Sequence, residues 1–502
     1  MTEAVRKALK EVLTAGYQIS KDGFDFLKSI NDESLLENLI QYAIKRANVL
    51  PEEKFILDEE FFRGLLEEIN LGKEVKREIT GRGGALPLAA EYEAEIKVLK
   101  DPTEGMGTEG DLKGFLEYFR DRYKRIERIF RKRIDTRDVT SIKESLRAPL
   151  KSKFKIIGII RDKRVSGNRL FIELEDLESS ATVLISTTGE QMRRAQELLL
   201  DQVVCMEVLK YREDLFIADD FLWPDIPDSK PKRSEVPLCA ALISDLHIGS
   251  RLFLRDLFLK FLRWLRGDFG PSELRSLAGR VKYLVIAGDL VDGIGVYPGQ
   301  EEELEVANLQ RQYEVATELL SALPDYIELI IIPGNHDAVR KSLPQPAIPK
   351  RYAESLHEDD RVTLLGNPSR VSLSGVEVLI SHGKALDDIL TQVPGLDFHK
   401  PKKGMEFLLR GRHLAPIYGA TTPIAPERRD WMVIESPPDI LHMGHVHVFD
   451  HGKYKEVTLV NSGTWQEQTS FQRRMGLTPT PGIAAVVDLQ TSQVVPLNFN
   501  LL

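Results

Sequence analysis

Ala241-Leu-Ile-Ser-Asp-Leu-His-Ile-Gly249 is the stretch around which the rest of the chain is organised. A run of apolar residues from Leu238 to Ile243 predicts a buried strand. Asp245 and His247 follow the strand two residues apart, which places a carboxylate and an imidazole on the same side of a turn. Oxygen and nitrogen ligands of this kind suit a divalent transition metal. By itself, the pair is equally compatible with a solvated loop.

Four more polar clusters follow apolar, strand-like runs farther along the chain. They are Gly288-Asp-Leu-Val-Asp292, Gly334-Asn-His-Asp337, Ser381-His-Gly383 and Gly444-His-Val-His447. In an α/β sheet, ligands bind beyond the carboxyl ends of the strands. We therefore expect the five clusters to meet at one edge of the fold.

The ordered set D-x-H, G-D-x-x-D, G-N-H-D, H-G and G-H-x-H resembles the calcineurin-like metallophosphoesterase superfamily. The resemblance implies two divalent metal ions, with Mn²⁺ expected and Fe or Zn as alternatives. Two metals about 3.5–4 Å apart supply a nucleophile at neutral pH and neutralise phosphoryl oxygens. The residues that the resemblance assigns to the metals are Asp245, His247 and His447 for the first, Asn335, His382 and His445 for the second, and Asp289 as the bridge.

Three further residues in these motifs receive other roles. His336 matches the superfamily histidine beside the phosphate, which stabilises charge or protonates the leaving oxygen. Asp337 is expected to orient the ring of His336. Asp292 is expected to cap the turn that follows it rather than to bind a metal.

Composition limits the classes of protein to which the chain can belong. Its 502 residues suggest two to four domains. No apolar stretch approaches the ~18 residues needed to span a bilayer, and the N-terminus lacks a signal-peptide core. We expect a cytoplasmic protein with no membrane contact. A formal net charge of −9 excludes a uniformly basic nucleic-acid binder. Cys205 and Cys239 are expected to be buried small hydrophobes.

The pattern of the chain predicts four segments. Residues 1–75 form a small helical domain, a candidate for partner docking, and residues 76–150 form a flexible linker followed by a basic helix. This helix is either a solvated amphipathic helix or a contact for nucleic acid or an acidic partner. Five strand-like runs with a helix before the fourth predict an all-β OB-fold over residues 151–225. It serves either as a scaffold or as a nucleic-acid platform.

Residues 238–502 are predicted to form the α/β calcineurin-like phosphoesterase domain, a β-sandwich flanked by helices. The expected fold class is therefore multidomain. No histidine precedes His247, so the chemistry is expected to lie in this last domain. Because the linker is glycine-rich, we expect residues 1–110 to be dispensable for activity and for binding a partner subunit.

An OB-like module directly before a phosphoesterase domain resembles the small subunits of archaeal family D DNA polymerases, most strongly over residues 242–465. The resemblance implies a 3′→5′ proofreading exonuclease that acts on single-stranded or mismatched 3′ DNA ends. It also implies a heterodimer with a large catalytic polymerase subunit, and a sliding clamp is a further candidate partner. The alternatives are a catalytically minor structural subunit of the polymerase and a free-standing metallophosphatase.

The segment from Gly404 to Asp430 also looks like that subfamily. Its basic and aromatic residues are expected to hold a single-stranded 3′ end by phosphate contacts and base stacking. The alternative is a packed insertion. The residues concerned are Arg410, Arg412, His413 and Tyr418.

Overall fold

The computed structural model describes residues 87–166, 169–186 and 190–502, and in the N-terminal part residues 9–10, 12–13, 17–30, 36, 39–40, 43, 56–59 and 62. The chain divides into two compact units, Met1–Ala85 and Leu86–Leu502. Helices and several separate sheets build these units. The prediction of a multidomain protein of mixed α/β structure is confirmed.

The first unit has a small apolar core of its own. Helix α2 (Lys21–Ser29) begins after Ser20, whose side chain accepts a hydrogen bond from the amide of Gly23. Strands β1 (Gln18–Ile19) and β2 (Ile56–Leu57) pair in parallel. The helix buries Phe26 and Leu27 against the side chains of Leu36, Leu39, Ile40, Ala43 and Phe62. The rest of the predicted helical domain lies outside the described residues.

The second unit contains a closed five-stranded barrel. Its strands are β4 (Lys153–Ser166), β5 (Arg169–Glu175), β6 (Ser180–Ser186), β7 (Val203–Lys210) and β8 (Leu215–Leu222). They neighbour one another in the order β4-β5-β6-β8-β7, and helix α7 (Glu190–Gln196) precedes the fourth strand of the barrel. Helix α6 (Ile142–Arg147) packs Ile142 and Leu146 against the barrel core. Strand number and helix position agree with the pattern in the sequence.

Two six-stranded sheets make up most of the remaining chain. The first has the order β12-β11-β10-β9-β18-β19 and the second β16-β17-β15-β14-β13-β3. The strands of the first are β9 (Cys239–Ile243), β10 (Val281–Ala287), β11 (Glu328–Ile332), β12 (Val362–Leu364), β18 (Ile483–Asp488) and β19 (Val494–Asn498). The strands of the second are β3 (Ile96–Lys100), β13 (Ser369–Leu373), β14 (Val376–Ile380), β15 (Ile440–Met443), β16 (Asp450–Tyr454) and β17 (Val457–Asn461).

The central strands are largely apolar because both of their faces are buried. In β9, Ala241 and Ile243 face the helices, whereas Ala240 and Leu242 face the second sheet. This alternation follows from the two-residue period of a strand. Strands β9, β10 and β11 run parallel to one another, and so do β14, β15 and β17. The loops after these parallel strands therefore gather at one edge of each sheet.

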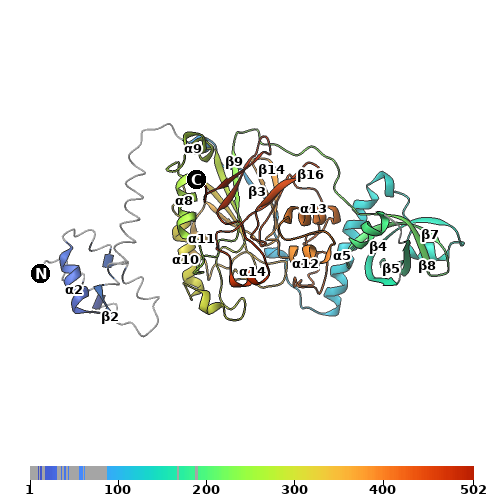
Figure 1. Cartoon of the computed structure of the whole chain (residues 1–502), viewed down its shortest axis with the longest axis horizontal. Coiled ribbons are helices and arrows are strands. Elements are labelled where there is room, and N and C mark those ends of the chain that lie inside the picture. The colour runs from blue at the N-terminus through green and yellow to red at the C-terminus, as the bar shows by residue number, and fades with distance from the viewer. Residues whose placement is uncertain are drawn as a thin grey trace. The chain divides into compact units, whose positions relative to one another are not determined.

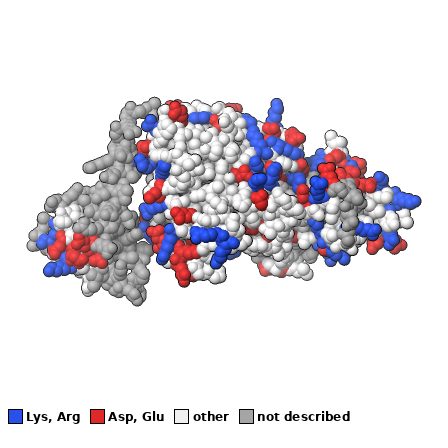
Figure 2. Space-filling model, in the orientation of Figure 1, with Lys and Arg blue, Asp and Glu red and all other residues white. Residues whose placement is uncertain are grey.

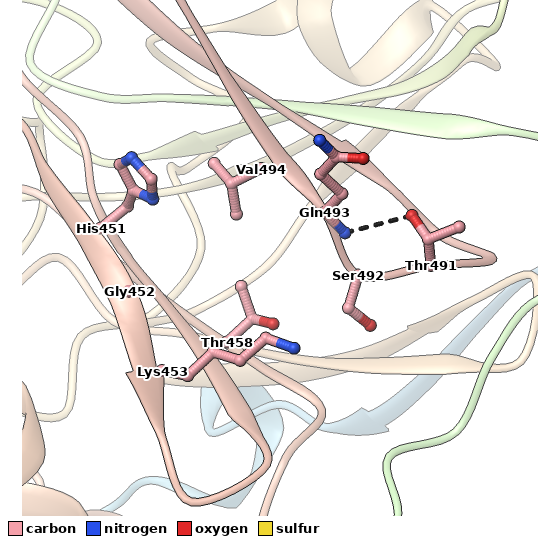
Figure 3. Close-up of a pocket in the computed structure, with 8 residues that line it drawn as sticks. All are labelled: His451, Gly452, Lys453, Thr458, Thr491, Ser492, Gln493 and Val494. Carbon is pink, nitrogen blue, oxygen red and sulfur yellow. Dashed lines mark hydrogen bonds between the residues drawn. The ribbon is translucent and has the colours of Figure 1, made fainter.

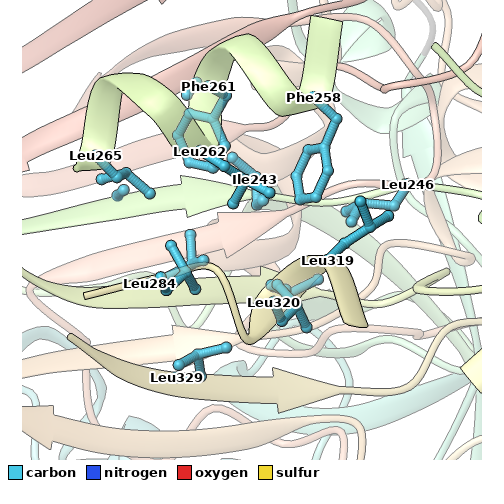
Figure 4. Close-up of a cluster of buried hydrophobic side chains, with 14 of the residues drawn as sticks. Ile243, Leu246, Phe258, Phe261, Leu262, Leu265, Leu284, Leu319, Leu320 and Leu329 are labelled. Atoms are coloured by element: carbon cyan, nitrogen blue, oxygen red, sulfur yellow. The ribbon is translucent and has the colours of Figure 1, made fainter. Parts of the chain in front are cut away.

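Helices cover the outer faces of both sheets (Figure 1). On the first sheet, α8 supplies Phe258, Phe261 and Leu265, which pack over Ile243 and Leu284 (Figure 4). Burying a side chain of this size contributes ~1.5–3 kcal/mol. Helices α12 and α13 lie on the second sheet. The helix bounds are α8 (Arg255–Leu265), α9 (Ser272–Ala278), α10 (Leu309–Leu320), α11 (Glu354–Glu358), α12 (Leu386–Gln392), α13 (Pro401–Gly411) and α14 (Ser470–Arg474).

The predicted basic helix is α5 (Leu112–Arg131), and two of its arginines point inward. Arg122 is fully buried, and its Nε lies 2.7 Å from Oδ2 of Asp430. The same guanidinium donates to the carbonyl of Asp201, beside the barrel, at 3.0 Å. Arg125 is also buried and pairs with Glu435 at 2.9 Å. Arg122 therefore joins the barrel to the sheets, and Arg125 ties α5 to Glu435. Neither arginine lies on a solvated face or at a surface for nucleic acid.

The predicted flexible linker over residues 76–110 is wrong for the part that the structure describes. Strand β3 pairs antiparallel with β13 and forms the edge of the second sheet. Ala89, in the short 3₁₀ helix Leu88–Glu91, is buried and donates its amide to the carbonyl of Gly279 at 2.8 Å. The amide of Glu95 donates to the hydroxyl of Tyr283 at 3.0 Å. The segments before and after β3 are rich in glycine, so the sequence around this short strand has the composition of a linker.

One smaller expectation is met within the described residues. Cys205 and Cys239 are both free and buried. Among these residues, no helix combines the length and the apolar character needed to cross a bilayer.

Candidate metal centre

The five polar clusters follow the strands that the sequence predicts. Asp245 and His247 follow β9, Asp289 follows β10, and Asn335 follows β11. His382 follows β14 of the second sheet, and His445 and His447 both follow β15. The site is therefore shared between two sheets whose parallel strands all point their carboxyl ends toward it.

The first predicted ligand group comes together as a buried cluster. One ligand atom from each of Asp245, His247 and His447 lies within 4.8 Å of the others. Nε2 of His247 lies 3.1 Å from Nε2 of His447, and the latter lies 3.4 Å from Oδ1 of Asp245. Oδ1 of Asp245 is buried and has no hydrogen-bond partner. Two ring nitrogens that face each other beside an unpartnered carboxylate oxygen fit a shared cation.

The second group gathers around Asp289. Its Oδ2 lies 3.2 Å from Nε2 of His382 and 3.7 Å from Nε2 of His247. His445 belongs to the same cluster of ligand atoms, within 4.8 Å. The amide oxygen of Asn335 lies 3.1 Å from Nε2 of His382. Asp289 thus lies between the two groups, as its predicted bridging role requires.

The contacts of the two ring nitrogens of His382 indicate whether the surrounding residues fit a metal ion. Its Nδ1 lies 2.9 Å from the carbonyl oxygen of Ala287, which can only accept, so Nδ1 carries the proton. The opposite nitrogen, Nε2, faces two oxygen acceptors, Oδ1 of Asn335 and Oδ2 of Asp289. A proton on Nε2, or a metal cation in its place, can hold these groups together in the buried site. The residues present therefore fit a divalent ion.

Burial and charge act in opposite directions on the pKa of His382. Burial lowers this pKa, but the carboxylate of Asp289 outweighs burial and raises it to about 9. Burial likewise opposes ionisation of Asp289, yet the surrounding imidazoles hold the pKa of its carboxyl well below the usual range. The cluster therefore favours positive charge at its centre, which is the electrostatic condition for holding a cation.

Most of the predicted ligands have a left-handed backbone. Such a conformation is uncommon for residues other than glycine and concentrates at functional sites. Among the described residues, the predicted ligands with positive φ are Asp245 (55°), His247 (52°), Asp289 (51°), His445 (70°) and His447 (61°). The neighbouring Gly334 has no room for a side chain, because a Cβ there would lie 2.1 Å from Oδ1 of Asp289. The backbone at the strand ends is shaped to bring these side chains together.

His336 lies beside both ligand groups and keeps one nitrogen free. Its Nδ1 donates to the carbonyl of Asp292 at 2.7 Å, and its ring contacts that of His247 at a centroid distance of 4.6 Å. Its backbone amide donates to Oδ1 of Asp289 at 2.8 Å. Burial lowers the pKa of His336 to about 4. The ring is therefore neutral at neutral pH, with Nε2 available as an acceptor.

Asp337 does not orient the ring of His336, contrary to the expectation from the sequence. Its carboxylate accepts from the amide of Gly334 at 2.8 Å and from the hydroxyl of Tyr313 at 3.0 Å. Burial raises the pKa of Asp337 to about 6. The adjacent position in the sequence does not bring the side chains together, because Asp337 turns inward toward α10. Its role is to hold the backbone that carries Asn335 and His336.

Three residues that support the site were not assigned this role from the sequence. Oδ1 of Asp292 lies 3.0 Å from Nδ1 of His247, so Asp292 orients a predicted ligand and does not merely cap a turn. Oδ2 of Asp387 lies 3.0 Å from Nε2 of His445. Nε2 of Gln472 lies 2.9 Å from Nδ1 of His447. Asp292 is itself a motif residue and Asp387 closely follows one in the sequence, whereas Gln472 gives no such signal.

The four residues predicted to contact DNA lie in packed surroundings. Arg412 is buried and donates to the carbonyls of Ile434 and Glu435, and His413 is buried with Nε2 2.8 Å from Oδ2 of Asp430. The guanidinium of Arg410 lies over the ring of Trp223 at 4.0 Å. Tyr418 packs against Phe115 and Phe119 of α5 at centroid distances of 5.3 and 5.7 Å. The segment is a packed insertion that joins α5 to the sheets, so the predicted DNA contact is not supported there.

A surface hollow of ≈ 320 Å³ lies elsewhere, between strand β16 and the turn that joins β18 to β19 (Figure 3). His451, Lys453, Thr458 and Ser492 are among its lining residues. None of the predicted metal ligands lines it. The chemistry of the histidine cluster is therefore separate from this hollow.

Comparisons with known proteins point to one family. The model of the B subunits of DNA polymerases alpha and epsilon matches residues 240–451. The DNA polymerase II small subunit of Methanothermobacter thermautotrophicus is 38% identical over 494 residues, which cover 97% of this chain and 98% of that protein. The protein of the same name from Archaeoglobus fulgidus is 41% identical, with 78% of each chain covered. That of Pyrococcus horikoshii is 38% identical, and the match covers 86% of this chain and 71% of that protein.

Proposed function

The chain belongs to the family of archaeal DNA polymerase II small subunits, and on this premise we propose that it is the 3′→5′ proofreading exonuclease subunit of a replicative DNA polymerase. In this proposal, the two sheets with their outer helices form a calcineurin-like metallophosphoesterase domain. The five-stranded barrel that precedes them is an OB-fold. The partner is the large catalytic polymerase subunit, with which the chain forms a heterodimer, and a sliding clamp remains a candidate partner.

The observation that carries the proposal is the convergence of buried imidazole, carboxylate and amide groups at the shared edge of the sheets. Oδ1 of Asp245 has no partner, and Nε2 of His382 faces two oxygen atoms. A purely structural subunit has no reason to keep such an arrangement, because buried acceptors without donors destabilise the fold. The donor set of carboxylate, amide and imidazole suits Mn²⁺, with Fe or Zn as alternatives.

The residues of the chain divide the work of hydrolysis among them. Two divalent ions bound here would neutralise the phosphoryl oxygens and provide a nucleophile from water at neutral pH. Asp292 and Asp387 fix the rings of His247 and His445 from behind through their remote nitrogens. His336 presents Nε2 toward the place where a phosphate would lie, and its Nδ1 is held by the carbonyl of Asp292. A bound phosphodiester would raise the pKa of His336, which prepares it to protonate the leaving oxygen.

The expected substrate is a single-stranded or mismatched 3′ DNA end. The net charge of −9 gives the whole chain no general attraction for DNA. Delivery of the 3′ end by the large subunit is therefore part of the proposal, and scaffolding of that subunit is a second role in addition to hydrolysis.

The decisive experiment is release of mononucleotides from a 5′-labelled single-stranded oligonucleotide by the purified chain with Mn²⁺. The proposal expects stepwise shortening from the 3′ end that chelation stops. A structural subunit would release no nucleotide. A free-standing phosphatase would instead prefer small phosphomonoesters over the oligonucleotide. Either result would contradict the proposal, and addition of the large subunit should raise the rate on a mismatched primer end.

A further inference from the structure

Helix α14 is fixed against the candidate metal centre by a single buried side chain. Nε2 of Gln472 contacts Nδ1 of His447 at 2.9 Å, and Oε1 of Gln472 accepts from the amide of Thr469 at 3.0 Å. The hydroxyl of Thr469 accepts in turn from the amide of Gln472, which completes a capping box. Beyond the helix, the amide of Thr480 donates to the carbonyl of His447 at 2.8 Å. This short helix therefore has a defined position beside a predicted metal ligand.

The outward side of α14 is apolar and basic at once. Phe471 and Met475 are 58% and 61% exposed, and their spacing of four residues places them on one face. Arg473 and Arg474 are exposed as well. Within the part of the chain that the structure describes, neither arginine has an acidic partner. Exposed aromatic and unpaired cationic groups beside the proposed phosphodiester site suit a ligand that has both a flat apolar face and negative charge.

Acidic and basic side chains around α14 limit where a negatively charged ligand can lie. Figure 2 shows a group of basic side chains over the position that α14 has in Figure 1, with acidic side chains beside it. The hydroxyl of Ser470 donates to Glu303 at 2.9 Å, and the neighbouring Glu301 and Glu302 are exposed. A phosphate backbone would be repelled by this acidic flank. The path that remains runs over the arginines.

We propose that α14 is the platform on which the last nucleotides of a single-stranded 3′ end bind. Phe471 stacks under a base, and Arg473 and Arg474 contact phosphates. A base offers the flat face and the backbone offers the charge, which is the combination that single-strand binding surfaces use. The inference rests on the proposed function and deepens it, because it places the DNA contact at α14 and away from the packed segment around Arg412.

Binding to DNA tests the platform without reliance on hydrolysis. The probe is a fluorescein-labelled single-stranded oligothymidylate with phosphorothioate linkages at its 3′ end, titrated with the full chain at several NaCl concentrations. Phe471→Ala should raise Kd by about 5- to 150-fold, the range for loss of one aromatic–base stack of about 1–3 kcal/mol. Phe471→Tyr should restore it. Replacement of both arginines by Gln should reduce the slope of log Kd against log salt by about 1.4, or about 0.7 for each phosphate that is no longer bound.

Matched controls lie on α5, away from the histidine cluster. Leu116→Ala removes a side chain that is 49% exposed, and Arg128→Gln removes an exposed arginine. Both should bind the probe like the unchanged chain. If the α14 variants also bind like the unchanged chain, the inference is wrong.

A second readout separates DNA from a protein partner. If the α14 variants keep the parent Kd for the probe but no longer co-elute with the large polymerase subunit, the helix is a protein-docking surface and the inference is overturned. The proposed function fails in a different way: the unmodified chain would then release no mononucleotide with Mn²⁺ while the effect of Phe471→Ala on Kd persists.

Discussion

Removal of the N-terminal region should have very different effects depending on where the cut falls. The sequence predicts that residues 1–110 are dispensable, yet the structure places the boundary between the two units after Ala85. Residues 87–110 include β3, which pairs with β13 of the second sheet. We expect deletion of residues 1–85 to leave the fold of the second unit unchanged and deletion of residues 1–110 to destabilise it strongly.

The size of the effect can be worked out from the contacts of residues 87–110. Ala89 is buried, and Tyr92, Ala94 and Ile96 pack against the core between the sheets. Partial burial of three such side chains contributes on the order of 3 kcal/mol. Deletion also removes Glu95 as the acceptor for the buried backbone amide of Ser374, at a cost of about 1–3 kcal/mol. The sum of ~4–6 kcal/mol is comparable with the whole free energy of unfolding of many domains, ~5–15 kcal/mol.

Denaturant unfolding of the two truncated chains, followed by fluorescence, measures this difference directly. The shorter deletion should unfold at the same denaturant concentration as the second unit of the intact chain. The longer deletion should unfold at a lower denaturant concentration, which corresponds to a free energy of unfolding that is smaller by ~4–6 kcal/mol, or it should aggregate. It should also lose exonuclease activity and binding to the large subunit. Equal stability of the two truncated chains would show that β3 contributes nothing and refute this reasoning. Loss of the large subunit on deletion of residues 1–85 alone would instead make the N-terminal unit the docking element.

Three substitutions at the metal centre carry further predictions. Asp289→Ala should remove both ions, seen by elemental analysis, and abolish nuclease activity in a protein with unchanged circular dichroism; near-normal activity would contradict a shared site. His336→Ala should lower kcat by about 10²–10⁴-fold with metal content intact, whereas the exposed His399→Ala should not; loss of a stoichiometric metal would make His336 a ligand. Asp387→Asn should weaken Mn²⁺ binding by about 10–100-fold in calorimetric titrations because it no longer fixes His445; an unchanged Kd would show that the contact is incidental.

The sequence was sufficient to predict the strands and the clusters that follow them. Largely apolar runs such as Val281 to Ala287 identify strands buried on both faces, and the structure has β10 there. The motif residues then follow from the geometry of parallel strands, whose carboxyl ends share an edge. Strand β3 was missed because it is short, lies at the edge of a sheet and exposes Val98 and Leu99. Its partner β13 is about 270 residues away, and pattern reasoning does not detect such pairing.

Side-chain directions were the other part that the sequence could not supply. A basic, aromatic segment such as Arg410 to Tyr418 has the composition of a DNA-binding surface, but its arginines are used internally. Asp430 pairs with His413, 17 residues away, and with Arg122 of α5, 308 residues away along the chain, so a distant helix helps to decide this outcome. Asp337 similarly follows His336 in sequence yet faces the opposite way. Composition indicates which contacts a residue can make, whereas packing decides which contact it makes.

Because the candidate site is shared between two sheets, the concentration of divalent ions should affect the stability of the fold. Asp289 follows a strand of the first sheet and His382 a strand of the second, so an ion held between them would link the two layers. A ligand that binds only the native state at 100 times its Kd stabilises that state by about 2.7 kcal/mol. Depletion of divalent ions should therefore lower the melting temperature of the sandwich as well as stop hydrolysis. If the proposed function holds, hydrolysis and scaffolding of the large subunit would then weaken together when metal is scarce, and the supply of divalent ions would control both.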